Sequence, residues 1–354
     1  MPPTLPARKA PPPRGRVPDH CEMNARLTGR RSSNVPGNSC ERGSSSAASG
    51  FTPQPPGEVL FDNIHAIAAD RKWRPIKDTE HILTAAGAHN GLSARLVDEA
   101  GFDFVWASGL EISASLGLAD ADIVGRTESA QAVSAILRAT SLPVIVDCDA
   151  GYGNAVNAWH TAQHYFAAGV YGLCLEDKTF PKMNSFVEHS HALIPAATMA
   201  GKVEAMLDCK VVEQQQVIAR TEALIAGASV DEALERGLAY AEAGADAVLV
   251  HDKTKHAEKL LEFAERWTSP TPLVCVPTTY YEFTTKELGE AGFSLAIYAN
   301  QGIRSQIAAV KRVLTQIRAN GSSRDVEDEI APVKEVFALQ RLDEVSALFE
   351  SYVR

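Results

Sequence analysis

Short apolar runs alternate with longer amphipathic stretches from about residue 80 onward. The runs are continuous rather than alternating in polarity, which is typical of strands that are buried on both faces. The stretches between them carry apolar residues at helical spacing. Eight runs can be counted: His81–Ala86, Phe102–Ala107, Leu142–Val146, Val170–Leu175, Gln216–Ala219, Ala245–Val250, Pro272–Val276 and Ser294–Ala299.

The intervening stretches predict helices, for example over Gly91–Glu99 and Val230–Ala243, each followed by a glycine suited to end a helix. Eight strand–helix units in succession predict an α/β fold, a (β/α)₈ TIM-like barrel, with an open doubly wound sheet as the alternative. Val333–Tyr352, with leucines and valine at near-helical spacing, predicts a packed C-terminal helix.

The first 57 residues differ in composition from the rest of the 354-residue chain. Residues 1–57 are rich in Pro, Arg, Ser and Gly, which predicts a disordered tail, and residues 58–354 form the predicted barrel domain. The tail carries a net charge of +5 and the whole chain −10, so the body is strongly acidic. An acidic body disfavours nucleic acid as a partner.

No apolar run reaches the roughly 20 residues that a membrane span needs, and a membrane partner is not expected. Cys148, Cys174 and Cys275 lie in apolar runs, where free cysteines behave as small buried hydrophobes. This usage favours a reducing compartment and a cytoplasmic location.

Polar residues follow the predicted strands, where a barrel gathers side chains at one mouth. The acidic members are Asp147, Asp149 and Glu176. Three crowded carboxylates need a cation, and oxygen ligands favour Mg²⁺ or Mn²⁺. Salt bridges to Arg220 or Lys178 are the alternative. Arg220, His251 and Lys182 can bind phosphate or carboxylate oxygens.

Four motifs resemble the phosphoenolpyruvate mutase/isocitrate lyase superfamily over roughly residues 80–350. They are Ala88-His89-Asn90-Gly91-Leu92-Ser93-Ala94, Trp106-Ala107-Ser108-Gly109-Leu110, Asp147-Cys148-Asp149-Ala150-Gly151-Tyr152-Gly153-Asn154 and Glu176-Asp177-Lys178-Thr179-Phe180-Pro181-Lys182-Met183-Asn184-Ser185. Lyases of the superfamily place a catalytic cysteine where this chain has Met183-Asn184-Ser185, so lyase chemistry is disfavoured.

The resemblance implies an isomerase, a magnesium-dependent phosphoenolpyruvate mutase that interconverts phosphoenolpyruvate and 3-phosphonopyruvate in phosphonate biosynthesis. Asn184 favours the mutase branch, since the hydrolases tend to carry Thr there. The alternative is a phosphonopyruvate hydrolase, which Glu176-Asp177-Lys178-Thr179-Phe180 and Asn154-Ala155-Val156-Asn157 resemble. A carboxylated substrate and a non-catalytic barrel are further alternatives.

The resemblance also implies a role for each matching residue. Asp147 is expected to bind Mg²⁺ most directly, and Asp149 and Glu176 through water. Asp120 matches the family's essential aspartate beside the migrating phosphoryl group, and Lys178–Ser185 belongs to a lid over the substrate. Ser108 with the backbone of Gly109 and Leu110 is expected to hold the substrate carboxylate. The phosphoryl group is expected among Trp106, Asn184, Arg220 and His251, with Lys182 and Ser185 contributed by the lid.

The segment that follows the lid departs from the family pattern. It reads Val187-Glu188-His189-Ser190-His191-Ala192, where the family has a Gly- and Arg-rich segment. This difference is expected to affect how well the lid excludes water from the site, and therefore which product forms. The resemblance further implies a homotetramer in which dimers exchange the last barrel helix.

Overall fold

The computed structural model describes residues 73, 75–76, 81–188 and 191–353. The segment 1–57, for which the composition predicts disorder, lies outside the described residues. The prediction of two regions divided near residue 57 therefore stays a prediction.

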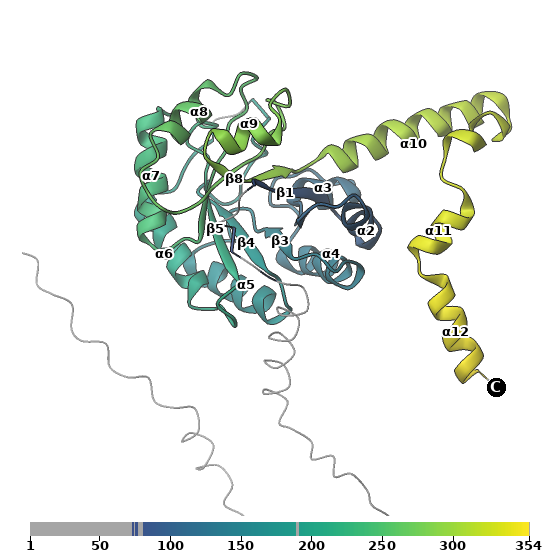
Figure 1. Ribbon diagram of the computed structural model, residues 1–354. Coiled ribbons are helices and arrows are strands. Elements are labelled where there is room, and N and C mark those ends of the chain that lie inside the picture. The colour runs from purple at the N-terminus through teal and green to yellow at the C-terminus, as the bar shows by residue number, and fades with distance from the viewer. Residues whose placement is uncertain (1–72, 74, 77–80, 189–190, 354) are drawn as a thin grey trace, which may run out of the picture. The chain divides into compact units, whose positions relative to one another are not determined.

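Eight parallel strands close into a barrel, in which each strand pairs with the next in sequence and β8 pairs with β1 (Figure 1). This confirms the (β/α)₈ barrel and excludes the open sheet. Each strand overlaps one of the eight apolar runs. The strands are β1 Leu83–Ala88, β2 Phe104–Ala107, β3 Val144–Asp147, β4 Gly172–Glu176, β5 Gln216–Thr221, β6 Ala247–Val250, β7 Leu273–Cys275 and β8 Phe293–Tyr298.

Helices follow the strands and surround the barrel, except that the helix after β8 projects away from it, with Ile303 as its one buried residue (Figure 1). They are α2 Gly91–Glu99, α3 Gly109–Ser115, α4 Arg126–Ala139, α5 Ala155–Ala167, α6 Ala196–Leu207, α7 Val230–Glu242, α8 Glu258–Glu265, α9 Thr285–Glu290 and α10 Gln301–Asn320. A 3₁₀ helix, η2 Arg324–Glu329, and two C-terminal helices, α11 Val333–Leu339 and α12 Leu342–Tyr352, complete the described part. None of the described helices combines the length and the apolar character needed to cross a membrane.

The strands are apolar throughout because both of their faces are buried. In β2, Phe104 and Trp106 belong to the core inside the barrel, whereas Val105 and Ala107 belong to the core between strands and helices. Successive side chains of a strand point to opposite faces, so each strand contributes to both cores. The three cysteines in apolar runs are buried and free, as predicted.

Two details of the helices bear on the sequence predictions. Gly101 and Gly244, placed at helix ends by the sequence, have φ of 79° and 94°, which suits glycine. The predicted C-terminal helix is divided in two, because Arg341 adopts a left-handed conformation with φ 54°. The packing expected for it is absent from the described part of this single chain, in which no residue of α11 or α12 is buried.

Candidate active site

The side chains that follow the strands converge at the C-terminal mouth of the barrel. Asp147 ends β3, Glu176 ends β4, Arg220 lies in β5 and His251 follows β6. Ser108 follows β2 and caps α3, because its hydroxyl accepts from the backbone N–H of Glu111 at 3.2 Å. The strand ends therefore place residues that are far apart in sequence around one small space.

That space is an inner cavity of about 50 Å³. Most of the predicted site residues line it: Trp106, Ser108, Leu110, Asp120, Asp147, Lys182, Asn184, Ser185, Arg220 and His251. An outer cavity of about 780 Å³ adjoins it and shares lining residues with it, among them Asp120, Asn184 and Phe186. Phe186, which the sequence did not single out, packs edge-on against His251, with ring centroids 5.9 Å apart. The lid therefore supplies part of the wall between the two cavities.

The remaining predicted residues contact this lining. A Cβ on Gly109 would lie 3.0 Å from Oδ1 of Asp149 and 3.3 Å from Oδ2 of Asp147, so glycine leaves room for both carboxylates. Glu176 is 1% exposed, and its Oε2 lies 3.3 Å from Nη2 of Arg220. All thirteen predicted residues are thus brought together, while their roles stay predictions.

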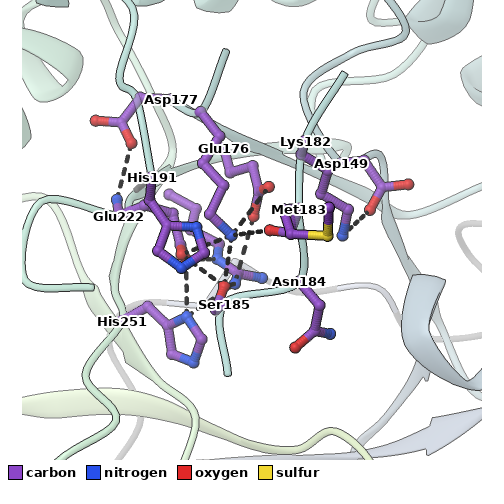
Figure 2. Close-up of polar contacts among 12 residues, drawn as sticks. Asp149, Glu176, Asp177, Lys182, Met183, Asn184, Ser185, His191, Glu222 and His251 are labelled. Atoms are coloured by element: carbon purple, nitrogen blue, oxygen red, sulfur yellow. Dashed lines mark hydrogen bonds and ion pairs between the residues drawn. The ribbon is translucent and has the colours of Figure 1, made fainter. Parts of the chain in front are cut away.

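Four residues on the acidic side form a group that we call the Lys182 cluster: Asp120, Asp149, Lys182 and Asn184. Nζ of Lys182 lies 2.6 Å from Oδ1 of Asp149 and 2.9 Å from Oδ1 of Asp120 (Figure 2 draws the contact with Asp149). The amide of Asn184 donates to Oδ2 of Asp120 at 2.5 Å. The backbone N–H of Lys182 also donates to Asp122. The lid is therefore held to the loop that carries Asp120 by an ion pair and hydrogen bonds.

Burial governs the charges in this cluster. Desolvation raises the pKa of Asp147 and, more strongly, that of Asp149, while Lys182 opposes both shifts. Burial would raise the pKa of Asp120, but Lys182, Asn184 and Arg220 together outweigh it and lower the pKa, so this carboxyl stays ionised. For Lys182, burial is outweighed by the carboxylates of Asp149, Glu176, Asp120 and Asp147, which hold its pKa well above the ordinary value. The ammonium of Lys182 thus supplies positive charge among these crowded carboxylates.

Five residues on the other side form the Glu222 cluster: Lys178, Ser185, Arg220, Glu222 and His251 (Figure 2). Glu222 is fully buried, and its carboxylate contacts Nε of Arg220 at 2.5 Å, Nδ1 of His251 at 2.7 Å and Nζ of Lys178 at 3.0 Å. The hydroxyl of Ser185 donates to it at 2.7 Å. Burial would raise the pKa of Glu222, but Arg220 and His251 hold it well below the ordinary value.

Glu222 and Lys178 are site residues that the sequence analysis left out of the predicted set. A signal for Glu222 existed, because Arg220-Thr221-Glu222 runs on from a strand and residues two apart point to the same side. Lys178 stands in the same position relative to Glu176.

His251 is held by one ring nitrogen and offers the other to the cavity. Its Nδ1 lies 2.8 Å from Nη2 of Arg220 and 2.7 Å from Oε1 of Glu222, whereas its Nε2 is buried without a hydrogen-bond partner among the described residues. Burial lowers the pKa of His251, so the imidazole is mostly neutral at pH 7. The two contacts of Nδ1 need different tautomers: a proton on Nδ1 donates to Glu222 and leaves Nε2 as an acceptor, whereas a proton on Nε2 lets Nδ1 accept from Arg220 and lets Nε2 donate to an anionic oxygen.

The loop that carries the two aspartates has an unusual backbone. We call residues 148–153 the metal loop, in which Asp149, Gly151, Tyr152 and Gly153 have φ of 50°, 80°, 57° and 144°. A Cβ on Gly151 would lie 2.7 Å from a methyl of Leu175, so both its φ and the space require glycine. The loop therefore turns sharply beside Asp147.

The chemistry of the donor set fits a hard divalent cation. Both carboxylate oxygens of Glu176 are buried and accept no hydrogen bond from the described residues. Within the described part of the chain no three His, Cys, Asp or Glu side chains are close enough to ligate one ion together. Mg²⁺ commonly uses one or two carboxylates and keeps several waters. The roles expected for Asp147, Asp149 and Glu176 toward such a cation stay predictions.

A closed barrel with buried carboxylates, an arginine and a histidine at its C-terminal mouth defines the class of (β/α)₈-barrel enzymes with a polar active site. Residues 74–318 match the family model described as phosphoenolpyruvate phosphomutase. The chain belongs to this family, within the phosphoenolpyruvate mutase/isocitrate lyase superfamily, and the predicted resemblance is confirmed.

Three relatives illustrate the match. The chain is 41% identical over 254 residues to phosphoenolpyruvate phosphomutase of Streptomyces hygroscopicus, which covers 72% of this chain and 81% of the relative. It is 38% identical over 283 residues to phosphonopyruvate hydrolase of a Variovorax species, covering 79% and 98%. A crystal structure of phosphonopyruvate hydrolase with oxalate and Mg²⁺ superposes with a TM-score of 0.73 at 37% identity, covering 83% and 99%. Mutases and hydrolases are thus similarly close.

Proposed function

We propose that this protein is a phosphoenolpyruvate mutase that uses Mg²⁺ to interconvert phosphoenolpyruvate and 3-phosphonopyruvate, the step that forms the P–C bond in phosphonate biosynthesis. The observation that carries the proposal is the pair Asn184–Asp120, joined at 2.5 Å in the wall of the inner cavity. An amide at this lid position, in place of the Thr that is common in the hydrolases, favours the mutase.

The reaction moves a phosphoryl group within one molecule. The P–O bond to the enol oxygen breaks, and a P–C bond to C3 of the same pyruvyl unit forms, so atoms and charge balance without a co-reactant. Such transfers have a loose transition state, and the protein acts mainly by positioning the group and stabilising its charge. Arg220, His251 through Nε2 and Asn184 supply the donors that this requires.

Substrate and cation would divide the site between them. The hydroxyl of Ser108 and the backbone N–H groups of Gly109 and Leu110, in the first turn of α3, would donate to the substrate carboxylate. Asp147 would hold Mg²⁺, with Asp149 and Glu176 acting through water. When bound, the ion supplies Lewis-acid polarisation of the pyruvyl oxygens. The crystal structure of the hydrolase relative, which contains Mg²⁺ and oxalate, supports a divalent cation here.

Asp120 would lie against the migrating group, opposite the cationic Glu222 cluster. Its carboxylate is ionised and oriented by Lys182 and Asn184. The lid residues Asn184 and Ser185, with Phe186 next to them, close the inner cavity. Closure matters because water at the phosphorus would yield phosphate and pyruvate instead of the isomer.

The test is ³¹P NMR of the purified chain with phosphonopyruvate and Mg²⁺. The phosphonate signal is expected to give way to that of phosphoenolpyruvate, and a matched sample with EDTA is expected to show no conversion. Inorganic phosphate as the first product would contradict the mutase.

Phosphonopyruvate hydrolase is the second candidate. The hydrolase relative is 38% identical and is covered over 98% of its length. The outer cavity of about 780 Å³ borders Asn184 and Phe186, so water that entered this cavity would be separated from the inner cavity by one side chain. The same ³¹P experiment separates the two reactions.

A homotetramer, expected from the family, stays part of the proposal. The C-terminal helices expose apolar side chains in the single chain: Val333 66%, Val345 54%, Leu348 56% and Phe349 63%. Apolar surface of this kind is typical of a subunit interface. Sedimentation equilibrium is expected to give four times the chain mass, and a monomer would contradict the expectation.

A further inference from the structure

Lys202 on α6 is a buried lysine that the proposed mechanism does not use. It is 2% exposed, and its ammonium donates to the backbone carbonyl of Ala150 at 2.8 Å. Burying an ammonium is costly unless it is well paired. A hydrophobic side chain of similar length would avoid that cost, so the cation needs another explanation.

The carbonyl that Lys202 contacts belongs to the metal loop. Three successive carbonyls of this loop accept hydrogen bonds from different parts of the fold. Cys148 accepts from the N–H of Gly151 at 2.8 Å, and Asp149 accepts from the N–H of Glu176 at 2.9 Å. The third carbonyl, that of Ala150, accepts from Lys202. This third contact comes from a side chain on a helix packed outside the barrel.

The loop needs such support because its backbone is unfavourable. Asp149 and Tyr152 are non-glycine residues with φ of 50° and 57°, a conformation that persists only where surrounding contacts hold it. Asp149 is also a predicted ligand of Mg²⁺. A change in the loop would therefore move a carboxylate at the site.

A second link runs from Lys202 toward the lid. The carboxylate of Asp122 opposes the fall in pKa that burial imposes on Lys202. Asp122 accepts from the backbone N–H of Lys182, and its Oδ1 is buried without a hydrogen bond among the described residues. The ammonium of Lys202 thus contacts the metal loop, and the charge of Asp122, to which the lid is hydrogen-bonded, favours its protonated form.

We infer that Lys202 is a positioning residue that holds the metal loop in its binding conformation and thereby sets the affinity for a divalent cation. The inference rests on the proposed function for the presence of that cation. It assigns no contact between Lys202 and the substrate or the ion. Its action is transmitted through the carbonyl of Ala150 to the neighbouring carboxylate of Asp149.

Binding of Mn²⁺, followed by electron paramagnetic resonance without substrate, tests the inference. Lys202→Met keeps the length of the side chain and removes the donor. It is expected to weaken Mn²⁺ binding about tenfold, the change in affinity that corresponds to the loss of one hydrogen bond from a charged group. Lys202→Gln keeps a neutral donor and is expected to lose less. Lys210→Met is the matched control, because Lys210 follows α6 and pairs with Asp246 at 2.7 Å.

Hydrogen exchange of the metal-free chain provides a readout that does not depend on the ion. The amide of Gly151, bonded to Cys148, is expected to exchange about tenfold faster in Lys202→Met, because local opening becomes easier. If Mn²⁺ affinity and this exchange rate both equal those of the unmodified chain, the inference is overturned, whatever happens to the melting temperature. If the unmodified chain binds no Mn²⁺, the proposed function fails, whereas equal binding of Mn²⁺ by the unmodified chain and by Lys202→Met overturns this inference alone.

Discussion

The Lys182 cluster and the Glu222 cluster lie at the same mouth but are built differently; Figure 2 labels Asp149, Lys182 and Asn184 of the first and Ser185, Glu222 and His251 of the second. In the Lys182 cluster, two carboxylates surround one ammonium, and its members come from loops and the lid. In the Glu222 cluster, Arg220 lies in β5, Glu222 directly follows β5, His251 follows β6, and two cations surround one carboxylate. In the proposed function, the first side would bind the metal cation and the second the phosphoryl anion.

This difference in construction indicates which residues are positioned by the barrel and which depend on the lid. Strand ends are fixed by the barrel, so Arg220, Glu222 and His251 are positioned by the fold itself. The acidic side depends on the lid, since Lys182 and Asn184 reach Asp120 only with the segment in place. The lid also supplies Lys178 and Ser185 to the Glu222 cluster. The segment 178–185 therefore contributes to both clusters, and substitutions in each should have different effects.

The largest effect is expected for Asp120→Ala in the Lys182 cluster. Loss of the carboxylate beside the migrating group is expected to lower kcat by about 10³-fold or more, measured by ³¹P NMR, while Mn²⁺ still binds through Asp147. Asp246→Asn, away from the mouth, is the control and should retain activity. Near-normal turnover of Asp120→Ala would remove the role assigned to this residue.

Glu222→Gln tests the other cluster and is expected to lower kcat/KM by about 10²-fold, because Arg220 and His251 lose their common anchor. It should also reduce the free energy of unfolding at pH 7, since it leaves buried cations unpaired. Glu232→Gln, which alters an exposed carboxylate paired with Arg236, is the control.

The pH dependence of stability sharpens this prediction. Arg220 and His251 depress the pKa of folded Glu222 well below the ordinary 4.5. Its contribution is therefore complete above pH 4.5 and is lost as the pH falls toward the folded pKa. The difference between wild type and Glu222→Gln in urea unfolding should shrink below pH 4.5. A constant difference down to pH 3 would contradict the pairing.

Phe186→Ala tests the wall between the cavities and is expected to have an intermediate effect. Removing the ring opens the inner cavity to the outer one, and the share of inorganic phosphate among the products is expected to rise about tenfold as water enters. Phe180→Ala, a lid residue outside both cavity linings, is the control. An unchanged product ratio in ³¹P NMR would mean that Phe186 does not exclude water.

Ser185→Ala is expected to have the smallest effect. Its hydroxyl bridges Lys178 at 2.5 Å and Glu222 at 2.7 Å, but these two groups also contact each other directly at 3.0 Å. KM is expected to rise about fivefold, which corresponds to one hydrogen bond of about 1 kcal/mol. A loss of more than 10²-fold in kcat would instead point to direct contact with the reacting group.

The sequence by itself determined the barrel and the membership of its mouth. Apolar runs at regular intervals can be buried only as strands with helices outside, and residues after those runs must then meet at one end. Asp147, Glu176, Arg220 and His251 could be placed in this way before any contact was known. The prediction of a single packed C-terminal helix was wrong in detail, because Arg341 interrupts it.

Only the tertiary structure decided which side chains pair. Three sets of contacts depend on distances between segments that are far apart in sequence. They are those of Glu222 with Lys178, Arg220 and His251, those of Lys182 with Asp149 and Asp120, and that of Lys202 with Ala150. Periodicity fixes the face on which a residue lies, whereas pairing depends on how elements pack in three dimensions. For this reason the sequence identified the charged mouth, and the fold divided it into the Lys182 cluster and the Glu222 cluster.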